Sequence, residues 1–219
     1  MLPRHRRAAA IMVLLVSAVG CASQPPGAPS HANTNIGPVI VSGRVLDFST
    51  NAGVAGATVS FGTTDGGPFA AVGTTTSNAT GSYTLSMATV AQMPGPRPWG
   101  VDVDSVWIGR ALLMVAGYRG DLLVHPGTCV TRYGIVADSQ TLRPIASATV
   151  KLLESSAVTT IDGWYRIDLG CPANSWVGYN TTFLYVTHPE HMDGSETVGR
   201  GVHSTERIDV WLQPRSSRR

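Results

Sequence analysis

An internal repeat constrains the fold of this 219-residue chain more than any other feature of its sequence. Residues 43–47 read Gly-Arg-Val-Leu-Asp, and residues 56–59 read Gly-Ala-Thr-Val. The pattern returns 91 positions later as Gly-Ile-Val-Ala-Asp at 134–138 and Ser-Ala-Thr-Val at 147–150. A repeated supersecondary unit predicts two copies of one small fold, arranged one after the other along the chain.

Each copy continues with threonines, a glycine and a tyrosine. These are Gly81 and Tyr83 in the first copy, and Gly163 and Tyr165 in the second. The first copy is about nine residues longer before its tyrosine, which predicts a glycine-rich hairpin extension over residues 62–70.

The residue types suggest a structural role for most of this pattern. Asp47 and Asp138 end the first strand of their copies, where a carboxylate can accept hydrogen bonds from the N–H groups of a turn. The repeat glycines allow the positive φ of a hairpin turn. We expect the repeat tyrosines to fill the core from the returning strand.

The chain between its two ends also predicts strands rather than helices. Short stretches alternate apolar and polar residues, are rich in Val, Thr, Tyr, Ile and Trp, and are bounded by turn residues. No stretch after residue 21 keeps the 3.6-residue period of a long helix. The expected strands are residues 39–46, 57–61, 83–87, 101–108, 149–153, 165–169, 183–187 and 208–212, with residues 111–116 as a fully buried strand.

Gly-x-Val-x-Asp, then Gly-Ala-Thr-Val, then Thr-x-Asp-Gly-x-Tyr resembles the carboxypeptidase regulatory-like domain. The resemblance implies an all-β fold of two tandem transthyretin-like (prealbumin-like) β-sandwiches, a fold also grouped as carbohydrate-binding-like, over residues 38–125 and 128–214. The second copy matches better, because residues 78–81 read Asn-Ala-Thr-Gly where Asp-Gly is usual. The motif residues are structural, so they predict a fold and hardly a function.

The N-terminus reads as an export signal that ends in a lipid-attachment cysteine. Residues 4–7 are basic, and residues 8–19 form an uncharged apolar run, which is shorter than the roughly 20 residues of a membrane span and typical of a signal peptide. Residues 18–21 read Ala-Val-Gly-Cys and resemble the lipobox of bacterial lipoproteins. We expect a signal peptide over residues 1–20 and lipidation of Cys21; the alternative is an ordinary secretory signal with an incidental cysteine.

The segments at the two ends of the expected domains lack a strand pattern. Residues 21–37 are rich in Pro, Ser, Ala and Asn and predict a flexible, lipid-anchored tether, and residues 215–219 predict a disordered tail. Ala22 follows the cysteine, which resembles the outer-membrane sorting rule if the cell has two membranes. The predicted location is the bacterial cell envelope, outside the cytoplasm, with the membrane as a partner through Cys21.

The charge of the exported chain argues against nucleic-acid binding. The full chain has 16 basic and 14 acidic residues. Three arginines leave with the signal peptide, so 13 basic residues face 14 acidic ones. A nearly neutral chain lacks the positive surface that nucleic acids require. The possible further partner is an envelope protein or a polysaccharide.

Cys129 and Cys171 remain once the signal cysteine is set aside. An even pair in an exported chain predicts a disulfide, which would stabilise by roughly 3–4 kcal/mol through its enclosed loop. Two free buried thiols, or a metal site, are the alternatives.

The cluster most suggestive of chemistry is residues 188–193, His-Pro-Glu-His-Met-Asp, with His203 and Glu206 downstream. Two histidines and two carboxylates within six residues could ligate a metal. Pro189, however, is incompatible with the regular helix of a His-Glu-x-x-His site. We expect a structural or solvated loop, with no metal and no cofactor.

One enzyme family, the intradiol ring-cleaving dioxygenases, shares the opening pattern of the repeat. Those enzymes hold non-haem iron through two tyrosines and two histidines in a His-x-His spacing, whereas His188 and His191 are three apart here. The chain has no Gly-x-Ser-x-Gly motif, and no pair of carboxylates can be assigned to acid and base roles from spacing. The sequence therefore predicts no catalytic residue and no enzyme.

Aromatic residues are dense in the second copy and would stack on sugar rings if they were exposed, although strand alternation places most of them in the core. They are Trp164, Trp176, Tyr179, Phe183 and Tyr185. The leading hypothesis is a non-catalytic envelope lipoprotein that acts as a structural or protein-interaction module. The alternatives are a carbohydrate-binding surface lipoprotein and, more remotely, a metal-dependent enzyme. Two coplanar, exposed aromatic rings on one face would favour sugar binding, and a pocket joining His188, His191 and a carboxylate would favour an enzyme.

Overall fold

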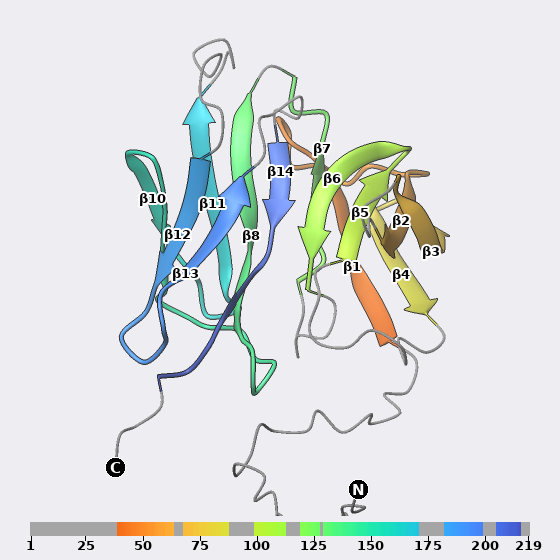
Figure 1. Ribbon diagram of the computed structural model, residues 1–219. Coiled ribbons are helices and arrows are strands. Elements are labelled where there is room, and N and C mark those ends of the chain that lie inside the picture. Colours follow the sequence, from red (N-terminus) through yellow and green to blue (C-terminus); the bar gives the residue numbers. More distant parts are fainter. Residues whose placement is uncertain are drawn as a thin grey trace, which may run out of the picture. The chain divides into compact units, whose positions relative to one another are not determined.

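The computed structural model describes residues 39–63, 68–87, 99–112, 119–127, 129–170, 182–198 and 205–215. All regular elements in these ranges are β-strands (Figure 1), so the predicted all-β class is confirmed. The ranges contain no helix long and apolar enough to span a membrane. The predicted signal peptide and tether, with Cys21, lie outside the described residues.

The first copy of the repeat folds into two sheets around one core. One sheet has the strand order β4-β1-β7, and the other contains β6, β5, β2 and β3 in that order. Their inward side chains form a single buried cluster that includes Val45, Phe61, Tyr83 and Val101. The strands are β1 (Val39–Asp47), β2 (Thr58–Thr63), β3 (Ala70–Thr76), β4 (Ser82–Met87), β5 (Trp99–Val103), β6 (Val106–Ala111) and β7 (Leu122–Val124).

The second copy also has two sheets and a core of its own. One sheet has the order β10-β9-β12-β13; in the other, β8 pairs with β11, β14 and β15. Val150, Tyr165, Leu184 and Val210 belong to this second core. The strands are β8 (Val130–Asp138), β9 (Thr149–Leu152), β10 (Ser155–Val158), β11 (Trp164–Gly170), β12 (Thr182–Thr187), β13 (Gly194–Val198), β14 (Thr205–Ile208) and β15 (Val210–Leu212).

The repeat tyrosines occupy equivalent places in the two cores. Tyr83 pairs with Gly43 across β4 and β1, and Tyr165 pairs with Gly134 across β11 and β8. Both rings are buried. Each hydroxyl donates a hydrogen bond to a backbone carbonyl, at 2.6 Å to Gly120 in the first copy and at 2.5 Å to Ile208 in the second. The predicted core role is confirmed, and it includes a polar contact to a third segment of the chain.

The repeat aspartates cap turns as predicted. Asp47 Oδ1 accepts hydrogen bonds from the N–H groups of Ser49 and Thr50 at 3.1 and 3.0 Å. Asp138 Oδ1 accepts them from Gln140 and Thr141 at 2.8 and 2.7 Å. Hydrogen bonds from the Ser49 hydroxyl and the Thr50 N–H lower the pKa of Asp47 far below its ordinary value. These carboxylates are thus used as turn acceptors.

Two of the expected strands are each divided. Residues 101–108 form a hairpin of β5 and β6, because Asp104 and Ser105 turn the chain with φ of 50° and 64°. Residues 208–212 are interrupted at Asp209, which separates β14 from β15. Of the buried strand expected over 111–116, only Ala111 and Leu112 lie in the described residues, where β6 ends.

Strand β14 belongs to the second copy in sequence but pairs with both copies. It runs parallel to β8, with Arg207 opposite Tyr133, and parallel to β6, with Arg207 opposite Gly109. One sheet therefore continues through both copies in the order β11-β8-β14-β6-β5-β2-β3 (Figure 1). The junction between the copies is built on β14.

Candidate functional site

The junction contains a second repeated motif that the sequence analysis missed. Residues 119–124 read Arg-Gly-Asp-Leu-Leu-Val, and residues 207–212, at an offset of 88, read Arg-Ile-Asp-Val-Trp-Leu. The apolar half of each motif forms β7 or β15, which pair in parallel with β1 and β8 at equivalent registers. The Arg-x-Asp half of each motif lies where the two copies meet.

Arg207 is fully buried and is shared between the two copies. Its Nε lies 3.1 Å from Asp209 Oδ1, with both side chains at 0% exposure. Its two terminal nitrogens donate to the carbonyls of Asp121 at 2.7 Å and Arg119 at 2.8 Å, both in the first copy. A guanidinium group presents five donors in a rigid fork, which suits one side chain to several acceptors.

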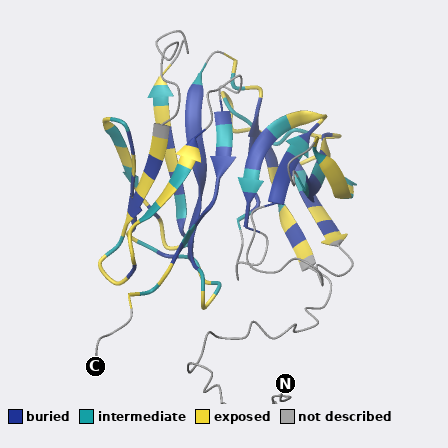
Figure 2. Cartoon of the chain, viewed as in Figure 1, coloured by how far each residue is buried: buried dark blue, intermediate teal, exposed yellow. Residues whose placement is uncertain are grey.

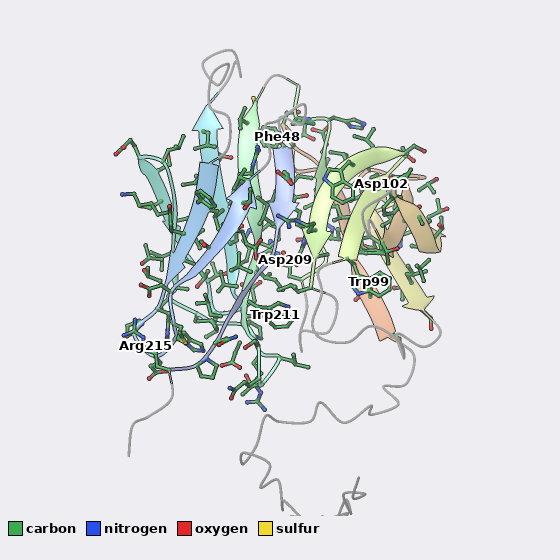
Figure 3. All side chains as sticks on the ribbon, in the orientation of Figure 1. Phe48, Trp99, Asp102, Asp209, Trp211 and Arg215 are labelled. Carbon is green, nitrogen blue, oxygen red and sulfur yellow. The ribbon has the colours of Figure 1, made fainter. Side chains whose placement is uncertain are left out.

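Asp209 accepts hydrogen bonds from both copies. Its Oδ2 accepts the N–H of Leu112 at 2.8 Å, and its Oδ1 accepts the N–H of Ile135 at 2.9 Å. Burial raises the pKa of this carboxyl, and the charge of Arg207 and the two N–H groups act against that rise. Figure 3 labels Asp209 among the strands where the copies meet.

The Arg-x-Asp motif of the first copy reaches into the second copy in return. Arg119 pairs with its own Asp121 at 2.9 Å and with Asp162, in the β10–β11 turn, at 3.3 Å. Its guanidinium carbon also lies 4.4 Å from the ring centre of Trp164. In the other direction, the Tyr133 hydroxyl accepts the N–H of Leu123 at 3.0 Å. The charged groups of the junction therefore contact backbone groups and each other, and their role is structural.

Of the structural or solvated loop expected from the sequence, the histidine cluster has the structural form. His191 is buried, and its Nε2 lies 2.9 Å from Asp138 Oδ2 while its Nδ1 lies 3.0 Å from His188 Nδ1. The carbonyl of His191 accepts a hydrogen bond from Arg215 at 2.6 Å. This segment therefore connects Arg215 to Asp138, which begins the turn after β8. His203 lies outside the described residues, and no group of three or more His, Cys, Asp or Glu side chains within them is placed to hold a metal ion.

His191→Ala is expected to lower the free energy of unfolding by about 1–3 kcal/mol, because it removes a buried partner of Asp138. The matched control is His125→Ala. His125 faces Asp47 in the first copy at 3.4 Å, but its side chain is 66% exposed, so its loss should stay within about 0.5 kcal/mol. Thermal melts of both variants measure the difference. Equal losses of stability in His191→Ala and His125→Ala would contradict this structural role. So would a melting temperature of the native protein that Zn²⁺ raises and a chelator lowers.

The expected disulfide is only partly within the described residues. Cys129 is disulfide-bonded, and it directly precedes Val130, which pairs with Gly170 at the end of β8 and β11. Cys171 directly follows Gly170 in the sequence but lies outside the described residues. The bond between Cys129 and Cys171 therefore stays a prediction.

Of the five aromatic residues considered for sugar stacking, the structure describes three. Trp164 is half-buried under Arg119, whereas Trp176 and Tyr179 lie outside the described residues. Phe183 and Tyr185 point outward from β12, so these two are not among the aromatic residues that strand alternation places in the core. Their rings are 6.1 Å apart on one face, but the ring planes meet at 45° and are not coplanar.

Comparison with known proteins adds no family to this description. Neither a protein-family model nor a curated protein matches the chain. Among solved structures, the shaft pilin SpaA from Lactobacillus rhamnosus GG is 11% identical over 81% of this chain and 98% of the pilin, with a TM-score of 0.26. A streptococcal ancillary pilin is 13% identical over 84% of this chain and 64% of the pilin, with a TM-score of 0.29.

A third neighbour is the Bacillus anthracis TIE protein, which is 11% identical over 81% of this chain, with a TM-score of 0.27. The chain covers 34% of that protein. It therefore spans about a third of TIE and just under two thirds of the ancillary pilin. At these values the likeness assigns neither a family nor a function to the chain.

Proposed function

We propose that this protein is a non-catalytic structural module of the bacterial cell envelope, in which two β-sandwich copies act as one unit. The observation that supports this most is the junction of the two Arg-x-Asp motifs. Arg207 and Asp209 contact both copies through fully buried groups. Independent modules joined by a linker would not need a buried ion pair, which is costly to desolvate, between them.

The use of the other polar groups supports the same proposal. The carboxylates of Asp47 and Asp138 accept turn N–H groups, and the repeat tyrosines donate to backbone carbonyls. The Nε2 atom of His191 is in hydrogen-bond contact with Asp138. An enzyme would instead leave such groups facing a substrate, so a metal-dependent enzyme is the least favoured function.

The proposed location rests on the N-terminal sequence. The basic, apolar and small-residue stretches before Cys21 resemble a lipoprotein signal, and residues 22–37 are proposed to hold the folded part clear of the membrane. The resemblance to carboxypeptidase regulatory-like domains fits this role, because its motif residues serve the fold. A module of this kind would act as a spacer or as a scaffold for an envelope protein.

Cys21→Ser is expected to abolish membrane association of the exported protein. A single acyl chain binds membranes only marginally, so stable anchoring implies more than one chain on the cysteine. Fractionation of cells that express the native and variant proteins measures this, and Ala22→Ser serves as a control beside the anchor. An exported Cys21→Ser variant that still sediments with the membranes would contradict the proposed anchor.

A further inference from the structure

We infer that the outer face of the sheet β10-β9-β12-β13 binds an acidic polysaccharide. The inward residues of these strands, such as Leu184 and Val186, belong to the second core, and the alternate residues face solvent (Figure 2). Strand register places the outward residues in adjacent rows, because paired residues point to the same side of a sheet. The outer face consists of Thr149, Lys151, Ser156, Val158, Phe183, Tyr185, Thr187, Ser195 and Thr197, all of which are exposed.

Two aromatic rings lie on the central part of this face. Phe183 is 45% exposed and Tyr185 is 53% exposed, and both are on β12, which is an interior strand of the sheet. Their ring centres are 6.1 Å apart. The core of this sheet is already filled by the alternate residues, so these neighbouring aromatic rings are left in water, which indicates a binding surface.

The surrounding residues indicate a sugar rather than a protein as the occupant. Five of the nine residues of the outer face are serine or threonine. Protein interfaces are depleted in serine and lysine, which here are Ser156, Ser195 and Lys151. Hydroxyl groups on both sides of β12 provide donors and acceptors for sugar hydroxyls, while the aromatic rings provide apolar faces for the sugar C–H groups.

The charge of the outer face selects an acidic sugar. Lys151 is the only lysine in the chain and the only residue of this face that is charged at neutral pH. It lies directly opposite Tyr185 in the register of β9 and β12, beside the aromatic pair. An ammonium group next to a stacking ring fits a carboxylate carried by the same sugar chain.

The angle between the two rings defines the form of the ligand. Because their planes meet at 45°, the rings do not form the coplanar platform that would by itself favour sugar binding, and they cannot both lie flat against one planar surface. They can stack on sugar units that are rotated relative to each other along a twisted single chain. A soluble, single-chain polysaccharide therefore fits this pair of rings better than a flat crystalline one.

Binding of the exported protein to immobilised polygalacturonate, with neutral dextran as the matched probe, tests this inference. We expect binding to polygalacturonate, with at least about tenfold weaker affinity for Tyr185→Ala and Phe183→Ala. Lys151→Gln should weaken binding to polygalacturonate and flatten its dependence on salt. Val72→Ala, which alters an exposed residue of β3 in the first copy, should bind like the native protein.

Three results would overturn the inference. The first is the absence of polygalacturonate binding by native protein that circular dichroism shows to be folded. The second is polygalacturonate binding that does not change in Tyr185→Ala and Phe183→Ala. The third is binding that is equally strong to dextran and insensitive to Lys151→Gln. Membrane fractionation of the same preparations shows whether the lipid anchor is intact, so failure of the sugar site is distinguishable from failure of the proposed envelope location.

Discussion

Replacing Arg207 by methionine is expected to lower the free energy of unfolding by about 3–5 kcal/mol, because it leaves the charge of Asp209 buried without its partner. Both side chains are fully buried. The carbonyls of Arg119 and Asp121 would also lose the donors that Arg207 supplies, and unpaired buried acceptors add to the cost. Urea unfolding followed by circular dichroism measures the loss.

Arg119 provides a matched control for this experiment. It occupies the same position in the first Arg-x-Asp motif, 88 residues earlier, but its side chain is 40% exposed. Arg119→Met should therefore cost no more than about 1 kcal/mol. A double variant of Arg207→Met and Asp209→Asn should recover part of the loss, since it removes the uncompensated charge. Equal losses for the two single methionine variants would contradict the proposed role of the junction.

The loss caused by Arg207→Met should also shrink as the pH falls. Burial raises the pKa of Asp209, and Arg207 opposes that rise, so the pKa rises further without the arginine. A carboxyl whose pKa is higher in the folded state favours folding below its unfolded value of about 3.9, and this contribution is lost as the pH rises through the folded value. The difference from the native protein is expected to be smallest below pH about 4 and largest near neutrality.

Gly134→Ala is expected to destabilise the protein by at least about 3 kcal/mol, because the change overpacks a site enclosed by backbone. A Cβ at this position would lie 2.2 Å from the carbonyl oxygen of Ile208 and 2.8 Å from Asp209 Oδ1. The contact falls on the segment that accepts the Tyr165 hydroxyl and carries Arg207. Relief of the clash would therefore require β14 to move away from β8.

Two other glycines make this prediction specific. Gly43, the equivalent residue of the first copy, would place a Cβ 2.3 Å from the backbone of Gly120, so Gly43→Ala should be comparably severe. Gly56 has a φ of +73° but open space around it, so Gly56→Ala should cost only the backbone strain, about 1 kcal/mol. Thermal unfolding of the three variants gives the order of their stabilities. A Gly134→Ala variant as stable as Gly56→Ala would refute the steric argument.

The parts of the fold that the sequence predicted correctly are those that local chemistry determines. Asp47 and Asp138 end strands and accept the N–H groups that follow within three residues, so their role can be inferred from neighbouring residues. The turn glycines Gly81 and Gly163 adopt φ of 78° and 71° as expected. The hairpin at Asp104 was missed because its positive φ angles fall on residues other than glycine.

The parts that the sequence analysis missed depend on contacts between distant segments. Period-two alternation along β12 shows that one set of alternate residues is buried, but it does not show which set. Packing against the opposing sheet buries Leu184 and Val186 and leaves Phe183 and Tyr185 exposed. His191 lies two residues after Pro189 in a segment that reads as a loop, and its contact with Asp138, 53 positions away, could not be inferred from its neighbours in the sequence. The Arg-x-Asp motif could have been found from sequence, since it repeats at an offset of 88 rather than 91.

Distance measurement between the two copies by pulsed electron paramagnetic resonance tests the central claim most directly. Spin labels on Val72→Cys in β3 and Ser156→Cys in β10, both exposed, would report on the first and the second copy, with Cys21→Ser removing the lipidation cysteine. If the Arg-x-Asp junction makes the two copies one unit, the distance distribution is a single narrow peak. A distribution as broad as that of two domains on a flexible linker would contradict the account.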